Sequence, residues 1–252
     1  MATVRFRFYE ELNDFLAPQR RRCEFPCRCV QGACVKHVIE TLGVPHTEVE
    51  LVLVNGESVG FERVLHDGDR VSVYPKFETF DVTPLVRVRE GALRTTRFVA
   101  DSHLGGLARL LRMIGFDTLY QNRFSDDEVE RLAREQQRIV LTRDRALLKR
   151  RGITHGCYVR ALRPRQQLRE IFDRLDLARA ARPFSRCLSC NGTLQVLEPQ
   201  RVEALVPPGV RDHYQRFCIC DGCARVFWEG THWQRMRDLV DALMAARIEE
   251  HA

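Results

Sequence analysis

Two stretches in the middle of the chain show the same order of apolar and polar positions. Residues 98–100 and 139–142 are short apolar runs, followed by Asp101 directly and by Asp144 after one further residue. After each aspartate, apolar side chains return at helical spacing. Such strand–helix repeats predict parallel strands, whose carboxyl ends meet at one edge of a sheet. We therefore expect the two carboxylates at one crevice.

The alternation continues on both sides of the second stretch. Residues 117–120 predict another strand, and Ser125, followed by acidic residues, predicts the start of a helix that runs through Gln137. Residues 156–161 predict a fourth strand, and Pro164 is typical of a helix start. The resulting order, strand then helix four times, predicts an α/β fold with a doubly wound parallel sheet.

The N-terminal part has a different pattern. Residues 3–8 alternate apolar and basic side chains, as a half-buried strand does, and residues 35–42 have one apolar helical face. Short helical spacing also occurs at residues 10–16, and apolar strands are predicted at residues 51–54 and 71–74. These elements within about 75 residues predict a small α+β domain.

The chain contains ten cysteines and begins with a charged stretch, MATVRFRFYEEL, that has no apolar core of a signal peptide. We therefore expect a cytoplasmic protein whose cysteines bind metal before they form disulfides. Cys187 with Cys190 and Cys220 with Cys223 form two C-x2-C pairs separated by 29 residues. This pattern predicts a closed structural zinc site. Cys218 offers a rival pairing with Cys220, at a poorer spacing.

Four other cysteines lie close together near the N-terminus. Their spacing is C-x3-C-x-C-x4-C, which lacks the paired knuckles of zinc sites. Reduced thiols without metal are therefore the favoured interpretation for this group, which consists of Cys23, Cys27, Cys29 and Cys34.

Composition excludes a membrane protein and permits a polyanionic partner. Hydrophobic residues make up 44% and charged residues 29% of the chain, as in globular proteins. No apolar run approaches the roughly 20 residues of a membrane span. The net charge of +6 permits a nucleic-acid partner without requiring one.

Acidic residues at the predicted strand ends and helix start are suited to bind divalent cations. Mg²⁺ prefers a few carboxylates together with water and substrate phosphate, and nucleases use such ions to activate water. Asp101, Asp144 and the acids that open the helix after Ser125 can all face one crevice. Alternatively, these acids only cap helices or complement helix dipoles. The residue pattern by itself leaves both interpretations open.

A resemblance favours the first interpretation. The segments FVADSHLGGLARLLRMIGFDTLY, SDDEVERLAREQQRIVLTRD, RCLSCNGTL and CDGCARVFWEGTHW resemble the PIN-like ribonucleases of the Mut-seven C-terminal family. That family joins a nuclease domain to a zinc ribbon, often behind a ubiquitin-like domain. The resemblance implies cleavage of single-stranded RNA, with Asp101, Asp126, Glu128 and Asp144 as the acids that bind Mg²⁺ or Mn²⁺. Spacing cannot rank Asp127 against Asp126.

A second resemblance concerns the N-terminal domain. VRFRFYEELNDFL, VKHVIETLG, LVLVNGES and LHDGDRVSVYP resemble the β-grasp fold of ubiquitin-like sulfur carriers, which work through a free Gly-Gly terminus. This chain has no Gly-Gly after Pro75 and continues with Lys76. Sulfur transfer is therefore disfavoured, and a docking or RNA-positioning role is expected instead.

Basic and aromatic side chains near these motifs are candidates for RNA contact. Arg109 and Arg112 share one helix side, and Arg143 and Arg145 flank the second strand-end aspartate. Arginine forks bind phosphate well, and the group beside the acids favours a polyanion, although each residue alone is better explained as a solvated surface charge. Phe227-Trp228 and His232-Trp233 suit base stacking, with packing inside the ribbon as the favoured alternative.

These observations predict a metal-dependent endoribonuclease, with a non-catalytic RNA- or ribosome-binding adaptor as the alternative. The expected partner is RNA, with tRNA and ribosomes as candidate sources, and the expected cofactors are structural zinc and catalytic Mg²⁺ or Mn²⁺. The oligomeric state is not predicted. The expected domains are a ubiquitin-like domain (1–78), a linker (79–95), a PIN-like nuclease domain (96–182), a zinc ribbon (183–235) and a C-terminal helix (236–252).

Overall fold

The computed structural model describes residues 1–76, 85, 88, 95–197 and 205–249. Most of the expected linker, residues 79–95, lies outside the described residues. The last three residues of the expected C-terminal helix, 250–252, also lie outside them. The chain divides into two compact units, each formed by two segments. The first unit comprises residues 1–95 and 125–159, and the second comprises residues 96–124 and 160–252.

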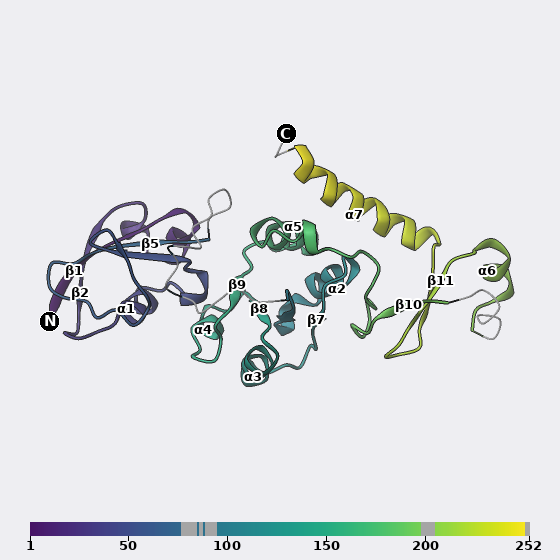
Figure 1. Cartoon of the computed structure of the whole chain (residues 1–252), viewed down its shortest axis with the longest axis horizontal. Helices are drawn as coiled ribbons and strands as arrows, with labels where there is room; N and C mark the ends of the chain where they lie inside the picture. Colours follow the sequence, from purple (N-terminus) through teal and green to yellow (C-terminus); the bar gives the residue numbers. More distant parts are fainter. Residues whose placement is uncertain (77–84, 86–87, 89–94, 198–204, 250–252) are drawn as a thin grey trace. The chain divides into compact units, whose positions relative to one another are not determined.

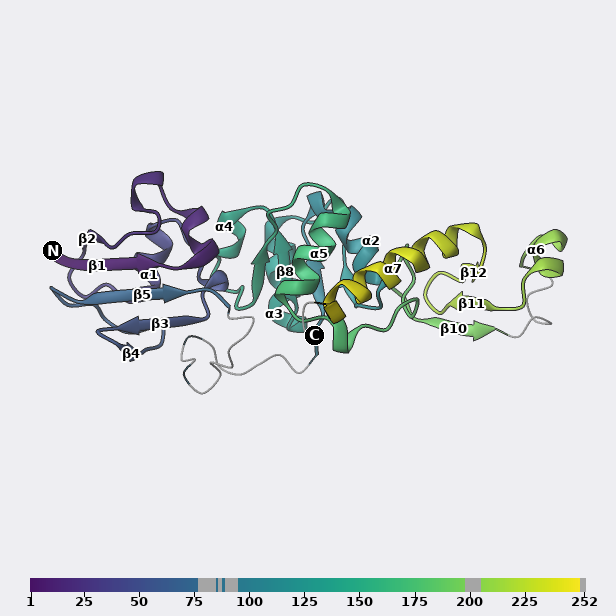
Figure 2. The same cartoon turned by 90° about the horizontal axis from the view of Figure 1, so that it is seen from above.

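The N-terminal part of the first unit is a five-stranded mixed sheet with the order β2-β1-β5-β3-β4 (Figure 2). β1 and β5 pair in parallel, and the other neighbours pair antiparallel. The sheet and its helix confirm the expected α+β domain. Its elements are β1 (Ala2–Phe8), β2 (Phe25–Cys29), α1 (Val35–Thr41), β3 (Leu51–Val54), β4 (Glu57–Ser58), β5 (Arg70–Tyr74) and short 3-10 helices at Glu10–Phe15, Pro18–Arg20 and His46–Glu48.

Alternating burial along β1 explains why this sheet covers a core. Every second residue of β1 is buried, and α1 places Val35, Val38 and Ile39 in the same core. Asn55 and Gly56 have φ values of 52° and 89°, as a tight hairpin between β3 and β4 requires. The positive backbone angles thus explain the Asn-Gly dipeptide.

β2 was not predicted from the sequence. It contains Cys27 and Cys29, and it pairs antiparallel with β1 so that Val4 lies opposite Cys27. Burial raises the pKa of both thiols. These two members of the N-terminal cysteine group are therefore part of the sheet, and both thiols are disfavoured from ionising.

The rest of the first unit alternates helix and strand. α3 (Asp126–Gln136) begins after Ser125, whose hydroxyl accepts a hydrogen bond from the Glu128 amide at 3.3 Å, and ends at Gln137 with a left-handed φ of 49°. β8 (Ile139–Thr142) is almost wholly buried and pairs in parallel with β9 (Gly156–Tyr158). Between these strands lies α4 (Arg145–Leu148).

The second unit begins with the same alternation. β6 (Phe98–Ala100) is completely buried and pairs in parallel with β7 (Thr118–Leu119). After a 3-10 turn at Ser102–Leu104, α2 (Gly105–Met113) packs against α5 (Pro164–Arg174). A Cβ atom at Gly106 would lie 2.6 Å from Cγ of Pro164, so the close approach of these helices requires glycine there. These elements confirm the expected α/β fold with parallel strands.

A small antiparallel sheet follows in the second unit, with the order β10-β11-β12. Its core is small: among the residues that the structure describes, the buried apolar cluster of this sheet consists of Leu197, Val206 and Phe217. None of the helices in the described part of the chain combines the length and hydrophobicity that a membrane crossing requires. The elements, seen in Figure 1, are a 3-10 turn (Ala178–Ala180), β10 (Leu194–Leu197), α6 (Pro208–His213), β11 (Phe217–Cys220), β12 (Val226–Trp228) and α7 (Thr231–Glu249).

Candidate functional site

Asp101 lies directly after β6 and is buried. Its Oδ1 atom accepts a hydrogen bond from the Ser102 hydroxyl at 3.0 Å and lies 3.7 Å from Nδ1 of His103. Tyr120 donates its hydroxyl to the Ser102 carbonyl at 3.1 Å, and its ring occupies the space that a Cβ at Gly105 would need. The turn after β6 is thus held by specific contacts, and it presents a carboxylate of fixed orientation.

Asp144 lies after β8 and caps α4. The Asp144 amide donates to the buried Thr142 hydroxyl at 2.9 Å, and Oδ1 of Asp144 accepts from the Ala146 amide at 2.7 Å. This N-cap was one of the two interpretations of the sequence, and the structure shows it. Because the cap uses a single carboxylate oxygen, it is compatible with a second role for the other oxygen.

The 3-10 helix at His46–Glu48 of the N-terminal domain contacts β9, the strand that follows Asp144 and α4. Glu48, which is 1% exposed, accepts a hydrogen bond from the Tyr158 amide of β9 at 2.7 Å. Buried His46 lies between Oε1 of Glu40, at 2.7 Å, and the carbonyl oxygen of Ile153, at 2.9 Å. These long-range contacts join the N-terminal domain to the β8–β9 segment within one unit.

The acids that open α3 differ in their partners. The guanidinium of Arg150 pairs with Asp126 at 3.5 Å, with Asp127, and with Glu130 at 3.1 Å. The hydrogen bonds that Arg150 donates to Asp127 and Glu130 raise the pKa of its guanidinium. Glu128 has no ion-pair partner among the residues that the structure describes, because residues two apart on a helix point in different directions.

Arg112 occupies a different environment from the one expected of an RNA-binding residue. Its side chain is 5% exposed and donates to the carbonyl oxygens of Thr118 at 2.9 Å, Leu188 at 3.2 Å and Ser189 at 3.0 Å. Burial lowers the pKa of this guanidinium. Arg112 therefore connects α2 to the first cysteine loop, and a buried guanidinium with three carbonyl partners is not available to phosphate.

The other arginines predicted to contact RNA are less buried. Arg109 is exposed on α2, and Arg143 is half-buried between β8 and Asp144. Arg145 is exposed, but its guanidinium lies 4.9 Å from the ring centre of Phe15 and 5.5 Å from that of Tyr158. Arg145 thus also contributes to the packing of the N-terminal domain on β9.

Four cysteines of the second unit converge. The sulfur atoms of Cys187, Cys190, Cys220 and Cys223 all lie within 4.8 Å of one another. Two of the separations are 3.7 Å, between Cys187 and Cys223, and 3.3 Å, between Cys190 and Cys220. Cys218, the rival candidate, is not part of this cluster.

The cluster matches the requirements of a zinc ion. Thiolates at about 2.3 Å from zinc in a tetrahedron lie about 3.8 Å apart, close to the observed separations. The Gly192 and Gly222 amides each donate to a cysteine sulfur at 3.4 Å, as in zinc knuckles. Four cysteine sulfurs can complete the tetrahedron, which leaves no position for water. This donor set could therefore hold a structural zinc ion.

The thiols of the cluster differ in acidity. Burial opposes ionisation of Cys220, but hydrogen bonds from the Cys223 amide, the Cys190 thiol and the Gly222 amide outweigh it and lower its pKa to about 7. Burial raises the pKa of Cys190 and that of Cys187. One thiolate is thus favoured near neutral pH, and a cation must compensate the ionisation of the others.

Sequence reasoning missed Asn191, which links the cysteine cluster to the α/β part of the second unit. Asn191 is buried, with a left-handed φ of 72°. Its side chain donates to Asp117 at 2.7 Å and accepts from the Thr118 amide at 2.9 Å. Asparagine tolerates this backbone conformation better than most residues. The C-x2-C-N sequence is the only local signal of this role.

Replacing Gly192 with alanine should weaken zinc binding by about tenfold or more. A Cβ atom at this position would lie 2.8 Å from the Cys220 sulfur and 2.6 Å from an Asp221 oxygen, so a ligand must move. Gly222→Ala is the matched control, because its Cβ would meet the sulfur atoms of Cys190 and Cys220 at 3.5 and 3.9 Å, which is ordinary contact. Competition with a chromogenic zinc chelator measures both. Equal affinities in the two variants would contradict this geometry.

Comparisons with known proteins agree with this architecture. The Mut7-C RNAse domain family matches residues 96–240, more than half of the chain, and the Mut7-C ubiquitin family matches residues 1–81. The first match includes every candidate acid and the four clustered cysteines. No curated protein and no solved structure matched the chain. The chain therefore belongs to the Mut7-C RNAse domain family and carries the Mut7-C ubiquitin domain before it.

Proposed function

We propose that this chain is a metal-dependent endoribonuclease that cleaves single-stranded RNA. The observation that carries this proposal is the family match over residues 96–240, which contain Asp101 directly after β6 and Asp144 separated by one residue from the end of β8. The family's name suggests RNA as the substrate. Transfer RNA and ribosome-associated RNA remain predicted sources of that substrate.

The proposed ligands of Mg²⁺ or Mn²⁺ are Asp101, Asp144 and acids of α3. Carboxylate oxygens alone are a donor set suited to these hard cations. When bound, such an ion lowers the pKa of a water molecule and stabilises the leaving oxygen of the phosphodiester. Ser102 and the Ala146 amide would orient the two aspartates, so that little freedom is lost on binding.

Among the acids of α3, we place Glu128 in the catalytic set ahead of Asp126. Arg150 already pairs with Asp126, with Asp127 and with Glu130, and an ion would have to compete with its charge. Glu128 lies outside this group. Asp126 remains a proposed ligand, and the experiment below ranks the two.

Arginines would hold the RNA backbone, and zinc would have a structural role. Arg109, Arg143 and Arg145 are the proposed phosphate contacts, whereas buried Arg112 is left out of this set. The zinc ion would be held by the four clustered cysteines, whose closed shell suits stability and not catalysis. The N-terminal domain would position the β8–β9 segment through Glu48 and His46.

Cleavage of an end-labelled single-stranded RNA by the zinc-loaded chain tests the proposal. We expect cleavage with added Mg²⁺ or Mn²⁺ and little with Ca²⁺, whose longer bonds and looser geometry fit such sites poorly. Glu128→Gln should reduce the rate by about a hundredfold, which corresponds to about 2.7 kcal/mol of transition-state stabilisation, and Asp126→Asn by about tenfold, or about 1.4 kcal/mol, because Asp126 is already paired with Arg150. RNA binding without cleavage under every metal condition would replace this proposal with the adaptor alternative.

A further inference from the structure

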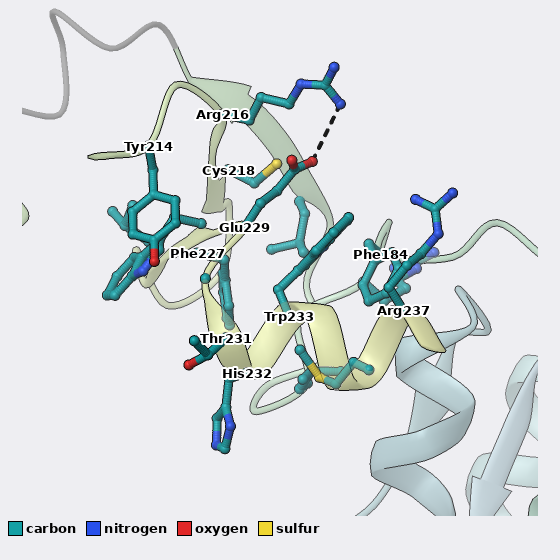
Figure 3. Close-up of a pocket in the computed structure, with 17 residues that line it drawn as sticks. Phe184, Tyr214, Arg216, Cys218, Phe227, Glu229, Thr231, His232, Trp233 and Arg237 are labelled. Carbon is teal, nitrogen blue, oxygen red and sulfur yellow. Dashed lines mark hydrogen bonds and ion pairs between the residues drawn. The ribbon is translucent and has the colours of Figure 1, made fainter. Parts of the chain in front are cut away.

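A cavity of about 610 Å³ lies in the second unit, between the antiparallel sheet and the start of α7 (Figure 3). Its size is within the range of roughly 300–1,000 Å³ that ligand pockets span. Its wall is formed by residues of β10, β11 and β12 and of α7. The loop before the first cysteine pair and the turn between β12 and α7 complete it. The zinc and carboxylate sites do not account for this cavity.

Aromatic rings dominate the wall. Tyr214, Phe227, Trp228 and Trp233 all line the cavity and are half-buried, with Phe184 beside them. The rings of Phe184 and Trp233 are 5.3 Å apart, with an interplanar angle of 37°. Packing within the ribbon explains the buried halves of these rings. It does not explain why so many of them open onto one hollow.

The backbone at Phe184 is strained in a way that keeps this ring in the wall. Phe184 has a φ of 60°, which is a rare conformation for a bulky side chain. Its amide donates to the Met113 carbonyl at 2.9 Å, which anchors the residue to α2. Strained residues persist where the surrounding structure determines them, and they concentrate at binding sites.

The charges around the cavity favour an anionic ligand. Arg186, Arg216 and Arg237 line it, whereas Glu229 is the single carboxylate among the lining residues. Glu229 pairs with Arg216 at 3.5 Å, and Arg237 pairs through Nε with Asp241 at 3.1 Å, with its guanidinium 5.6 Å from the Trp233 ring centre. Each guanidinium carries five N–H donors, so these contacts leave donors for phosphate. Aromatic faces beside arginine forks suit a nucleotide chain better than an apolar peptide.

We propose that this cavity, the ribbon pocket, binds unpaired bases of single-stranded RNA. Trp228, Tyr214 and Trp233 stack on the bases, and Arg216 and Arg186 contact the adjoining phosphates. The choice of RNA rests on the proposed nuclease function, for which the ribbon pocket is a substrate-holding site. Bases stacked inside a duplex are not available to such a pocket, so the site selects single strands.

Intrinsic fluorescence tests the ribbon pocket in the full chain. The chain has two tryptophans, Trp228 and Trp233, and both line the pocket, so a tryptophan signal reports on this site. A short 2′-O-methyl oligouridylate, which resists cleavage, is titrated into the zinc-loaded chain without Mg²⁺ or Mn²⁺. We expect saturable quenching by this probe and none by an abasic strand of the same length or by a duplex.

Substitutions measure what the pocket contributes to binding. Trp228→Leu should weaken binding of a labelled oligouridylate by about tenfold, in line with the loss of one stacked base. Arg216→Ala should weaken it severalfold and lower its salt dependence, whereas Arg165→Ala, which removes an equal charge from exposed α5 outside the pocket, should have a smaller effect. Retained zinc and an unchanged circular dichroism spectrum show that a variant is folded. If Trp228→Leu loses zinc, Tyr214→Leu is used in its place.

Three results would overturn the ribbon pocket. The first is an unchanged affinity for the oligouridylate in the folded Trp228→Leu and Tyr214→Leu variants. The second is tryptophan quenching by the abasic strand or the duplex that equals quenching by the oligouridylate. The third is no quenching by any RNA, which would point to a partner other than RNA. The proposed nuclease function fails separately, through metal-independent or absent cleavage. Asp101→Asn should quench as the wild type does, so a loss of catalysis cannot be mistaken for a loss of the pocket.

Discussion

Asp101→Asn is expected to reduce RNA cleavage by at least about a thousandfold. Losing one negative ligand removes several kcal/mol of transition-state stabilisation, and each 1.4 kcal/mol is about tenfold in rate. Asparagine has the size of aspartate and keeps an oxygen that can accept the Ser102 hydroxyl. The buried turn after β6 should therefore stay intact. Single-turnover cleavage of labelled RNA at saturating protein concentration measures the chemical step.

Two further variants separate charge from position at this turn. Ser102→Ala removes the hydrogen bond that orients the carboxylate but not its charge, so we expect a loss of only about tenfold. Asp212→Asn removes a carboxylate from the exposed surface of α6 in the same unit and should leave the rate unchanged. Wild-type cleavage by Asp101→Asn would exclude Asp101 from the chemistry, whatever the other variants do.

Cys220→Ser is expected to unfold the antiparallel sheet of the second unit. Zinc in structural sites contributes roughly 10–16 kcal/mol of apparent binding free energy at neutral pH, which is available to folding. In the described part of the chain, the buried apolar cluster of this sheet is limited to Leu197, Val206 and Phe217, and so small a cluster cannot replace the metal. Unfolding would also deprive buried Arg112 of two carbonyl partners and so weaken the α/β part of the unit.

Hydrogen exchange and zinc content measure this effect. The amides of β10, β11 and β12 should exchange at the rate of unfolded chain in Cys220→Ser, and zinc should be lost. Cys218→Ser is the matched control on the same strand, because its thiol lines the ribbon pocket and lies outside the cluster. Protected strands in zinc-free Cys220→Ser would show that the sheet folds without metal.

The same site should lose affinity for zinc as the pH falls. Thiolates bind the metal, so protons compete with it. The pKa of Cys220 is lowered to about 7, which means that its thiolate is present above this pH in the metal-free protein and is lost below it. Because burial raises the pKa of Cys187 and Cys190, zinc binding must displace protons from these thiols even at neutral pH. Proton release on zinc binding is the corresponding observable.

The sequence alone determined the elements with strong local signals. The runs of β6 and β8 have the predicted bounds, because each is an uninterrupted stretch of residues suited to a buried strand and each ends near an aspartate. Ser125 caps α3 as predicted, since capping depends on residues three positions apart. The two C-x2-C pairs converge because knuckle spacing is itself local.

Only the tertiary structure decided which side chains on one face of a helix or strand are buried, and which residues they contact. Arg109 and Arg112 share a helix side by spacing, yet one is exposed and the other holds the first cysteine loop. Asn191 and the rings of the ribbon pocket acquire their roles from segments distant in the chain. The periodicity of apolar residues predicts which side chains share a face of a helix. The segment that packs on this face comes from a distant part of the sequence, which periodicity does not indicate. That is why the C-x2-C pairs and the strands that precede Asp101 and Asp144 followed from the sequence, whereas the role of Arg112 and the existence of the ribbon pocket did not.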